Sequence, residues 1–182
     1  MILDSLLSFC PVGSNQSLVA GAGVSIASLN TIDLLGTGVG TAPQNIIGNA
    51  TLFGEDAGVG MNKPQVEVLI GTAFTTGNSA TLNVAFQGAP DTGSSGSYQP
   101  GTWTTLVETG PIAAASLTAN ALIARFDFPP AFPANLSPRY LRLYFQIVTA
   151  TNFTAGTIGS AIVTMVRDDY AAKYATKNFF VA

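Results

Sequence analysis

The amino-acid sequence predicts an all-β protein, an antiparallel β-sandwich of jelly-roll type with extended N- and C-terminal arms. Apolar and polar residues alternate in several short segments, which is the pattern of strands with one buried face. Gly, Ser and Pro residues separate these segments. No amphipathic stretch of about 10 to 15 residues lies between them, which disfavours an alternating β-α-β architecture. With 182 residues, the chain is long enough for one domain with its own core.

The most regular strand pattern is RYLRLYFQIVT, at residues 139–149. Similar patterns occupy residues 66–70, 81–86 and 122–128, and residues 158–166 give a fifth. In each of them one face is apolar and predicts contact with the core. The side chains that we place in the core are Val66, Val68, Ile70, Leu82, Val84, Phe86, Leu122, Ala124, Phe126, Phe128, Leu141, Leu143, Phe145, Ile147, Ile158, Ile162 and Val166.

Two further segments, residues 28–34 and 103–108, are rich in strand-forming residues and bring the predicted count to about seven or eight strands. The connections agree with short strands. Residues 88–103 and 129–138 are rich in Gly, Ser or Pro, and proline cannot donate a hydrogen bond to a sheet. We therefore expect two loops there, both too long for tight hairpins.

Two regions fall outside the strand pattern. Residues 36–64 are glycine-rich, and because a structureless loop of that length is uncommon, we expect an inserted loop that orders against something else. The predicted organisation is one jelly-roll domain over residues 1–166, with this insertion, and a C-terminal arm over residues 167–182. The arm carries Tyr170 and Tyr174 at helical spacing and ends in the apolar residues Phe179, Phe180 and Val181, which predict a binding partner.

The inventory of reactive groups excludes several classes of function. The sequence has no histidine, which removes the most common general base and zinc ligand. Cys10 is the only cysteine, so we expect no disulfide, and we interpret it as a small buried hydrophobe. The net charge is −3 and no basic residue precedes Lys63, which disfavours nucleic-acid binding. Apolar runs end long before the roughly 18 residues of a membrane-spanning helix. We therefore expect no enzyme activity, no cofactor, no metal, and neither a nucleic-acid nor a membrane partner.

Three motifs with known chemistry are present only in part. Residues 35–43, LGTGVGTAP, have the spaced glycines of a dinucleotide loop, but no helix is predicted after them. The acidic pairs at residues 55–56 and 168–169 lack the further oxygen ligands of a calcium site and are typical of a solvated surface. Trp103 and Tyr98 are aromatic residues on which a sugar ring can stack, although a lone tryptophan on a strand is more often a core or interface residue.

Arg139 and Arg142 lie in the most regular strand pattern, with no acidic residue near them in the sequence. Two interpretations stay open. In the first, the aliphatic stems lie along the outer face of the sheet and the charges reach water. In the second, the guanidinium groups pair with carboxylates of another protein molecule, where the planar fork of arginine is favoured.

Four segments together resemble the tailed-phage capsid cement (decoration) proteins of the jelly-roll type described for a Bordetella phage. They are MILDSLLSF, SLNTIDL, GEDAGVGMNKPQVEVLIGTAF and PRYLRLYFQI, in the order expected for that family. The resemblance runs, with gaps, over most of residues 1–166. Residues 37–52 are an insertion relative to the family pattern, and the tail after Arg167 is longer than expected.

The resemblance implies a structural virion protein on the outer surface of the capsid, which stabilises the shell by bridging neighbouring major capsid protein subunits. It also implies a homo-oligomer, for which we favour a homodimer over a homotrimer. The start of the chain, with Asp4 and no basic residue, is not typical of a secretory signal, so we expect synthesis in the bacterial host cytoplasm. The alternative is a carbohydrate-binding receptor or head-fibre module on the same virion.

Apolar ends and outward arginines predict the contacts of such a protein with its neighbours. The contact residues that we predict are Ile2, Leu3, Leu6, Leu7, Phe9, Phe53, Arg139, Arg142, Tyr170, Tyr174, Phe179 and Phe180.

Overall fold

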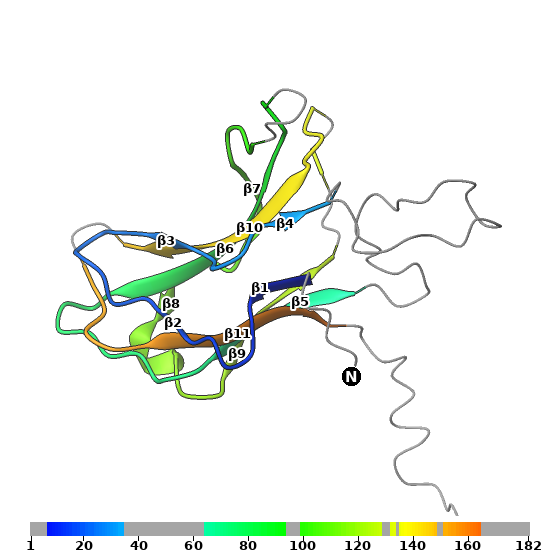
Figure 1. The fold of residues 1–182 in the computed structure, drawn as a ribbon. Coiled ribbons are helices and arrows are strands. Elements are labelled where there is room, and N and C mark those ends of the chain that lie inside the picture. The colour runs from blue at the N-terminus through cyan, green and yellow to red at the C-terminus, as the bar shows by residue number, and fades with distance from the viewer. Residues whose placement is uncertain are drawn as a thin grey trace, which may run out of the picture.

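The computed structural model describes residues 7–34, 64–93, 99–128, 132–133, 135–148 and 151–164. In this part of the chain two antiparallel sheets pack face to face, so the protein is an all-β sandwich (Figure 1). The five-stranded sheet consists of β1 (Ser8–Cys10), β2 (Gln16–Ser17), β5 (Gln65–Ile70), β9 (Leu122–Asp127) and β11 (Thr157–Thr164). The six-stranded sheet consists of β3 (Ile26–Ala27), β4 (Ile32–Asp33), β6 (Thr81–Ala89), β7 (Thr104–Glu108), β8 (Ile112–Ala113) and β10 (Tyr140–Ile147). A short 3₁₀ helix, η2 (Ala114–Ser116), follows β8.

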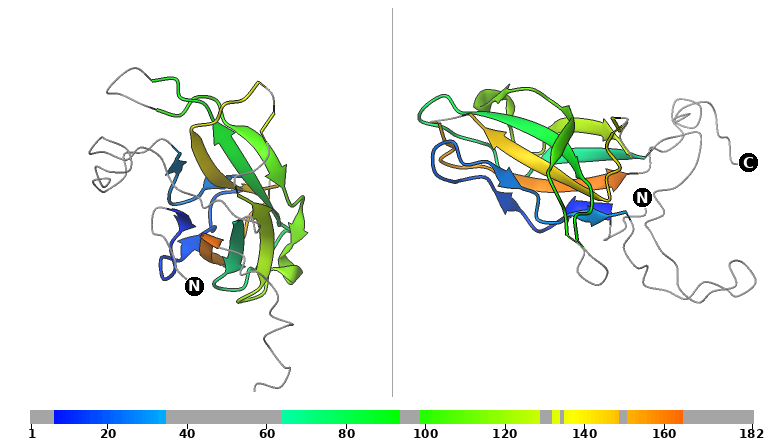
Figure 2. Two further views of the ribbon diagram at one scale, coloured as in Figure 1. Left: turned by 90° about the vertical axis from the view of Figure 1, so that its right-hand side faces the viewer. Right: turned by 90° about the horizontal axis from the view of Figure 1, so that it is seen from above.

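The strands pair in a nested order along the chain. β1 pairs with β11, β3 and β4 pair with β10, β5 pairs with β9, and β6 pairs with β7 and β8, all antiparallel. Two further pairings, β11 with β5 and β10 with β6, join these ribbons into the two sheets. Seen from above, the six-stranded sheet runs from green β7 and β6 through yellow β10 to blue β3 (Figure 2). Strands that are far apart in the sequence are therefore neighbours in both sheets.

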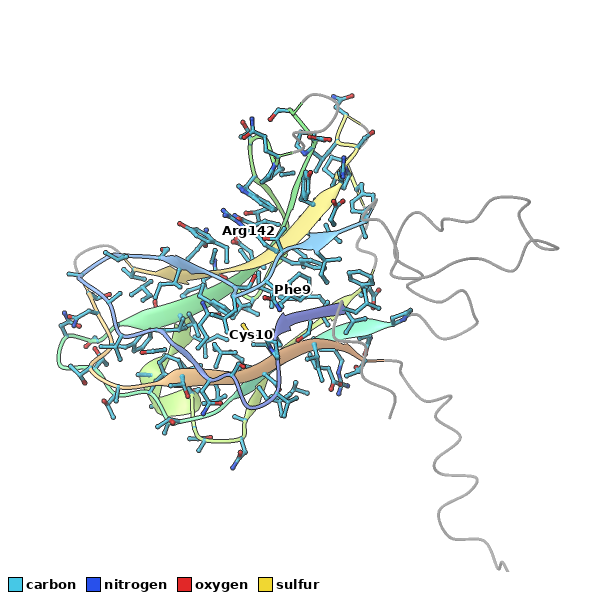
Figure 3. The ribbon with its side chains drawn as sticks, viewed as in Figure 1. Phe9, Cys10 and Arg142 are labelled. Atoms are coloured by element: carbon cyan, nitrogen blue, oxygen red, sulfur yellow. The ribbon has the colours of Figure 1, made fainter. Side chains whose placement is uncertain are left out.

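The core lies between the two sheets and is built from the alternating apolar residues of the strands. Phe86 of β6 meets the ring of Phe9 edge-on, with 5.6 Å between the ring centroids. It also stacks on Phe126 and Phe128, at centroid distances of 6.0 and 6.3 Å. Aromatic pairs of this kind stabilise a core beyond the burial of their area. Figure 3 shows Phe9 between the sheets.

The predicted core is confirmed on β5, β6 and β10, where every side chain that the alternation places inward is buried. On β9 it is confirmed for Ala124 and Phe126, and also for Phe128 just after the strand. The prediction is wrong for Leu122, which is 45% exposed. Leu122 pairs with Leu69 of β5, and the register between the two strands shifts between Val68 and Leu69. The alternation of β9 therefore does not extend back to its first residue. Val166 lies outside the described residues.

A bulge changes which residues of β11 face the core. Ile158 is buried in the core as predicted, but the register with β5 shifts between Ile158 and Ser160. Beyond the shift, Ala161 and Val163 lie opposite core residues of β5, whereas Ile162 lies opposite an outward residue. Ile162 is buried, as predicted, at 7% exposure, but it is not part of the core cluster; the prediction is wrong in the face, because the extra residue reverses the alternation.

The strand predicted at residues 103–108 is confirmed as β7, which begins one residue later. The strand predicted at residues 28–34 is wrong in its extent, because β4 covers only Ile32–Asp33. The short strands β1, β2, β3 and β8 were not expected from the sequence, since two or three residues are too few for an alternation to be seen. Hydrogen bonds to the longer strands place them in the sheets.

The long connections lie at the positions where the loops were predicted. β6 continues to Ala89, after which the connection to β7 is closed by an isolated bridge between Asp91 and Pro100. The described residues of the loop at 129–138 contain no strand. The insertion before Pro64 and the C-terminal arm lie outside the described residues. None of the helices within the described ranges is long and apolar enough to cross a membrane.

Candidate functional site

The outer face of the six-stranded sheet carries a row of polar side chains at its centre. Since the core residues of β10 alternate with the outward ones, the prediction of its outward face is confirmed. In the register of the sheet, Arg142 of β10 lies opposite Gln87 of β6, and Gln87 lies opposite Thr105 of β7. Three strands from different parts of the sequence therefore build this row. The outward residues of β10 are Tyr140, Arg142, Tyr144 and Gln146.

Arg142, Trp103, Tyr144 and Gln87 form a cluster that we call the Arg142 stack. The guanidinium carbon of Arg142 lies 4.1 Å from the ring centroid of Trp103 and 4.8 Å from that of Tyr144, both within cation–π distance. Arg142 Nε donates a hydrogen bond to Gln87 Oε1 at 2.9 Å. Gln87 is buried and donates through Nε2 to Thr105 Oγ1 at 3.2 Å. Two rings and one amide therefore hold the guanidinium group, which Figure 3 shows on the outer side of the sheet.

Arg142 differs from the other two arginines of the described chain in the groups that surround its guanidinium. Arg125 lies 2.7 Å from a carboxylate oxygen of Glu67, and Arg139 pairs with two carboxylates. Among the described residues, no carboxylate lies within ion-pair distance of Arg142, and no hydrogen-bond acceptor lies at its Nη1 or Nη2. Desolvation by partial burial lowers the pKa of Arg142, because burial disfavours the charged form. Arg142 is thus an oriented and partly desolvated cation.

A second polar row lies beside the Arg142 stack on the same face. Asn83 of β6 donates through Nδ2 to Glu108 Oε2 at 2.9 Å and to Gln146 Oε1 at 2.7 Å. Thr109 Oγ1 donates to Asn83 Oδ1 at 3.3 Å. Between the two rows lies the buried Ala85, opposite Tyr144 in the register. The face therefore combines amides, aromatic rings, the carboxylate of Glu108 and the cation of Arg142.

Arg139 forms ion pairs with two carboxylates from other segments of the chain, at one end of the six-stranded sheet. Its Nε and Nη2 donate to the two carboxylate oxygens of Asp33 at 2.8 and 2.9 Å, and its Nη1 donates to Asp91 Oδ2 at 2.7 Å. The hydrogen bonds and the charge of Asp33 raise the pKa of Arg139. The pKa of Asp91 is lowered, chiefly by the backbone N–H of Gly93, then by that of Gln99 and by Arg139. We call Arg139, Asp33 and Asp91 the Arg139 cluster.

The two arginines therefore have different surroundings, which the sequence did not reveal. The prediction that Arg139 pairs with another molecule is corrected: its carboxylate partners belong to the same chain, 106 and 48 positions away. A separation of that size leaves no local pattern. Arg142 lies along the outer face, as in the first interpretation, and its Nη1 and Nη2 have no acceptor among the described residues, as the second requires.

Two of the predicted contact residues, Leu7 and Phe9, do not lie on the surface. Phe9 is completely buried against Phe86, and Leu7 is 8% exposed. The prediction is corrected for both, because the two sheets of the same chain already enclose these side chains. The other predicted contact residues lie outside the described residues; they are Ile2, Leu3, Leu6, Phe53, Tyr170, Tyr174, Phe179 and Phe180.

Gln87 as a member of the site, and the contact of Trp103 with Arg142, were not predicted from the sequence. A signal for Gln87 was present, because the alternation of residues 81–86, continued by one residue, places Gln87 on the same face as Asn83. No signal in the sequence pairs Trp103 with Arg142, since their strands are joined only through β6.

Cys10 is buried, as predicted, and it has a polar neighbour. Its Sγ donates a hydrogen bond to Gln16 Oε1 at 2.9 Å, and Gln16 Nε2 donates to the backbone carbonyl of Ala27 at 2.5 Å. Desolvation raises the pKa of the Cys10 thiol to about 11. The thiol is therefore protonated near neutral pH, and only the thiolate is a strong nucleophile.

Comparison with known proteins assigns no family. No family model matches the chain, and no curated protein matches it either. In the described ranges, no three His, Cys, Asp or Glu side chains are grouped so that they could hold a metal ion. The positive observations that bear on function are the sandwich, its strand order and the Arg142 stack.

Proposed function

We propose that the protein is a structural virion protein that binds the outside of a tailed-phage capsid and bridges neighbouring major capsid protein subunits, as a homodimer. The strand order supports the jelly-roll part of this proposal. Pairing of the first strand with the last, and so on inward, arises when a long β-ribbon folds over into two sheets. The four-segment resemblance of the sequence to jelly-roll cement proteins points the same way.

The observation that carries the proposal is the Arg142 stack on the outer face of the six-stranded sheet. Arginine, tryptophan and tyrosine are the residue types most enriched at the energetically important centres of protein interfaces. Here the three types lie together, and the side chain of Gln87 is fixed beneath them. An oriented cation and two rings lose little conformational entropy on binding, which favours recognition of another protein.

A cement protein stabilises a shell by mass action. If it binds the assembled shell and not the free subunits, each occupied site adds RT ln(1 + [L]/Kd) to the stability of the assembly, about 2.7 kcal/mol at a concentration 100 times the Kd. Many equivalent sites multiply this effect. Moderate affinity at each seam is therefore enough for a large effect on the whole shell.

The proposal is tested by mixing the purified full-length chain with empty, expanded capsids of the phage that encodes it. We expect saturable co-sedimentation with a fixed ratio to the major capsid protein, and a higher disruption temperature of the decorated shells. A map of the decorated particle then gives the position and the number of copies. Chain that remains in the supernatant at saturating concentration contradicts the proposal.

The predicted role of the C-terminal arm has its own test. A chain without residues 168–182 is expected to keep the sandwich fold and to lose retention on capsids or self-association. Circular dichroism of the truncated chain measures its fold, ultracentrifugation measures its self-association, and co-sedimentation measures its retention on capsids. Unchanged capsid occupancy contradicts a contact role for the arm.

Carbohydrate binding is the second candidate, and the partly exposed Trp103, with the amides of Gln87 and Asn83 on the same face of the sheet, favours it. Against it, one face of the Trp103 ring is covered by the Arg142 guanidinium group. A glycan screen discriminates between the two functions. Saturable sugar binding that is lost in Trp103→Ala favours the receptor module.

A further inference from the structure

We infer that Arg142 is the anchor of the partner interface and that it binds the carboxylate of an Asp or Glu side chain of the capsid subunit. This inference rests on the proposed function and adds to it the chemical group that is recognised. The carboxylate is expected to bind end-on, to Nη1 and Nη2, because Nε is already used by Gln87. Paired N–H donors of this kind match the two oxygens of a carboxylate.

The charges of the chain itself support this assignment. The described residues contain three arginines, and two of them, Arg125 and Arg139, are paired with carboxylates of the chain. Arg142 has rings and an amide around it instead, although burial of part of its surface has already removed water. A cation that is partly desolvated and has no counter-charge among the described residues gains more from a carboxylate than a fully hydrated one does.

Among the residues that the structure describes, a carboxylate from a second copy of this chain is a less suitable occupant. Every carboxylate of the described residues already accepts a hydrogen bond or an ion pair within the chain. These carboxylates are Asp33, Glu67, Asp91, Glu108 and Asp127. Arg142 of a second copy would have to share one of these carboxylates with its present partner, which makes the described carboxylates of a second copy a less suitable source than the capsid subunit.

The rings of the Arg142 stack argue for an anionic group over a neutral sugar. Trp103 and Tyr144 both present a ring face to the guanidinium group, at 4.1 and 4.8 Å. Those faces are not open for stacking on a pyranose ring. The Nη1 and Nη2 atoms of Arg142 have no acceptor among the described residues, and the natural ligand of this charged end is an anion.

The first experiment measures the capsid affinity of the full-length chain and of two variants at Arg142. Arg142→Met keeps an apolar stem and removes the charge, and we expect at least a tenfold loss of affinity, about 1.4 kcal/mol. Arg142→Lys keeps the charge and loses the fork, so we expect a smaller but clear loss. Arg125→Met is the matched control, because that arginine is an exposed pair on the other sheet, and its affinity should change by less than about twofold.

The second experiment does not require capsids. Trp103 is the only tryptophan, so its fluorescence reports on the Arg142 stack. Titration of the full chain with N-acetyl-glutamate N-methylamide should give a saturable change that weakens with added salt, whereas the neutral glutamine analogue should give none. The change should be absent in Arg142→Met.

The outcomes separate the two proposals. Failure of the wild-type chain to bind capsids overturns the proposed function. Capsid binding that is equal in wild type and Arg142→Met overturns the inference and leaves the function standing. Equal responses to the glutamate and glutamine analogues also overturn the inference, and they do so even if the Arg142 variants do not fold. A change of oligomeric state in Arg142→Met, with capsid affinity unaltered, assigns the surface to a second copy and overturns it as well.

Discussion

Gln87 accepts a 2.9 Å hydrogen bond from Arg142 Nε across the ladder of β6 and β10. The buried amide therefore sets the direction of the guanidinium group, because its Nε2 is held at the same time by Thr105. One side chain inside the sheet face orients the cation that we propose as the anchor of the interface.

Replacement of this amide tests the arrangement. Gln87→Leu should lower the free energy of unfolding by about 1 kcal/mol, since it removes two hydrogen bonds at a buried position. It should also shift the emission of Trp103, because Arg142 is no longer fixed beside the ring. Gln65→Leu is the control: its side chain makes one longer bond of 3.3 Å at an exposed position, so we expect a change below about 0.5 kcal/mol. Equal effects of the two substitutions on stability and emission contradict this role of Gln87.

The burial of Phe9 predicts a large loss of stability. Phe9→Ala should lower the free energy of unfolding by about 3–5 kcal/mol, because it leaves a cavity beside Phe86 in the centre of the core. Val12→Ala serves as the control three residues later, at a position that is 64% exposed. Urea denaturation measures both. If Phe9→Ala is no more destabilising than Val12→Ala, Phe9 is not a core residue.

Gly156 has a backbone conformation that other residues rarely adopt, with φ of +137°. A Cβ atom at this position would also collide with the ring of Phe74. Gly156→Ala should therefore cost about 3 kcal/mol or more, or prevent folding. Gly77→Ala is the matched control, since no atom lies within 4 Å of the position of its Cβ atom. A thermal midpoint of Gly156→Ala that equals that of Gly77→Ala contradicts this prediction.

The Arg139 cluster predicts a loss of stability in acid. The pKa of Asp91 in the folded chain lies below its ordinary value of 3.8, so the carboxylate stabilises the fold above that pH. This contribution is lost as the pH falls through the lowered pKa. We expect Asp91→Asn to be less stable than the wild type near neutral pH and to lose less stability on acidification. Unfolding midpoints between about pH 6 and pH 2 measure this difference.

A substitution at a neighbouring uncharged residue is the control for the loss of stability in acid. Thr92→Val, in the same connection, should keep the wild-type pH profile, because it leaves the carboxylate and its donors in place. If Asp91→Asn and the wild type lose stability in parallel, Asp91 does not supply this part of the acid sensitivity.

The burial of the Cys10 thiol predicts that the native thiol is protected from alkylation and that the folded chain loses stability at high pH. Iodoacetamide should modify Cys10 only after unfolding, since the native thiol is buried and its pKa is raised to about 11. Because the unfolded thiol ionises near 9.0, the protonated native form loses stability as the pH rises from about 9 to about 11, by about 2 kcal/mol. Cys10→Ala should lack this part of the decline. Rapid alkylation of the native chain at neutral pH contradicts the predicted burial.

The strand at β10 shows why part of this fold is predictable from the sequence. Its eight residues alternate without interruption, and alternation depends only on the geometry of the strand itself. Ile162 shows where the prediction fails, because one extra residue in β11 reverses the facing of everything after it. Such a bulge depends on the pairing with β5 and cannot be predicted from the sequence of β11 alone.

Three features follow from the amino-acid sequence without any knowledge of the pairing: the short strands with one apolar face, the burial of Cys10 and the outward direction of Arg142. The tertiary structure alone decided which strands are neighbours. The nested pairing brings Asp33 and Asp91 to Arg139, and it brings Gln87 and Trp103 to Arg142. The difference is one of range: the facing of a side chain follows from a repeat of two residues, whereas Asp33, Asp91, Gln87 and Trp103 come from segments tens of positions away from the arginines that they contact.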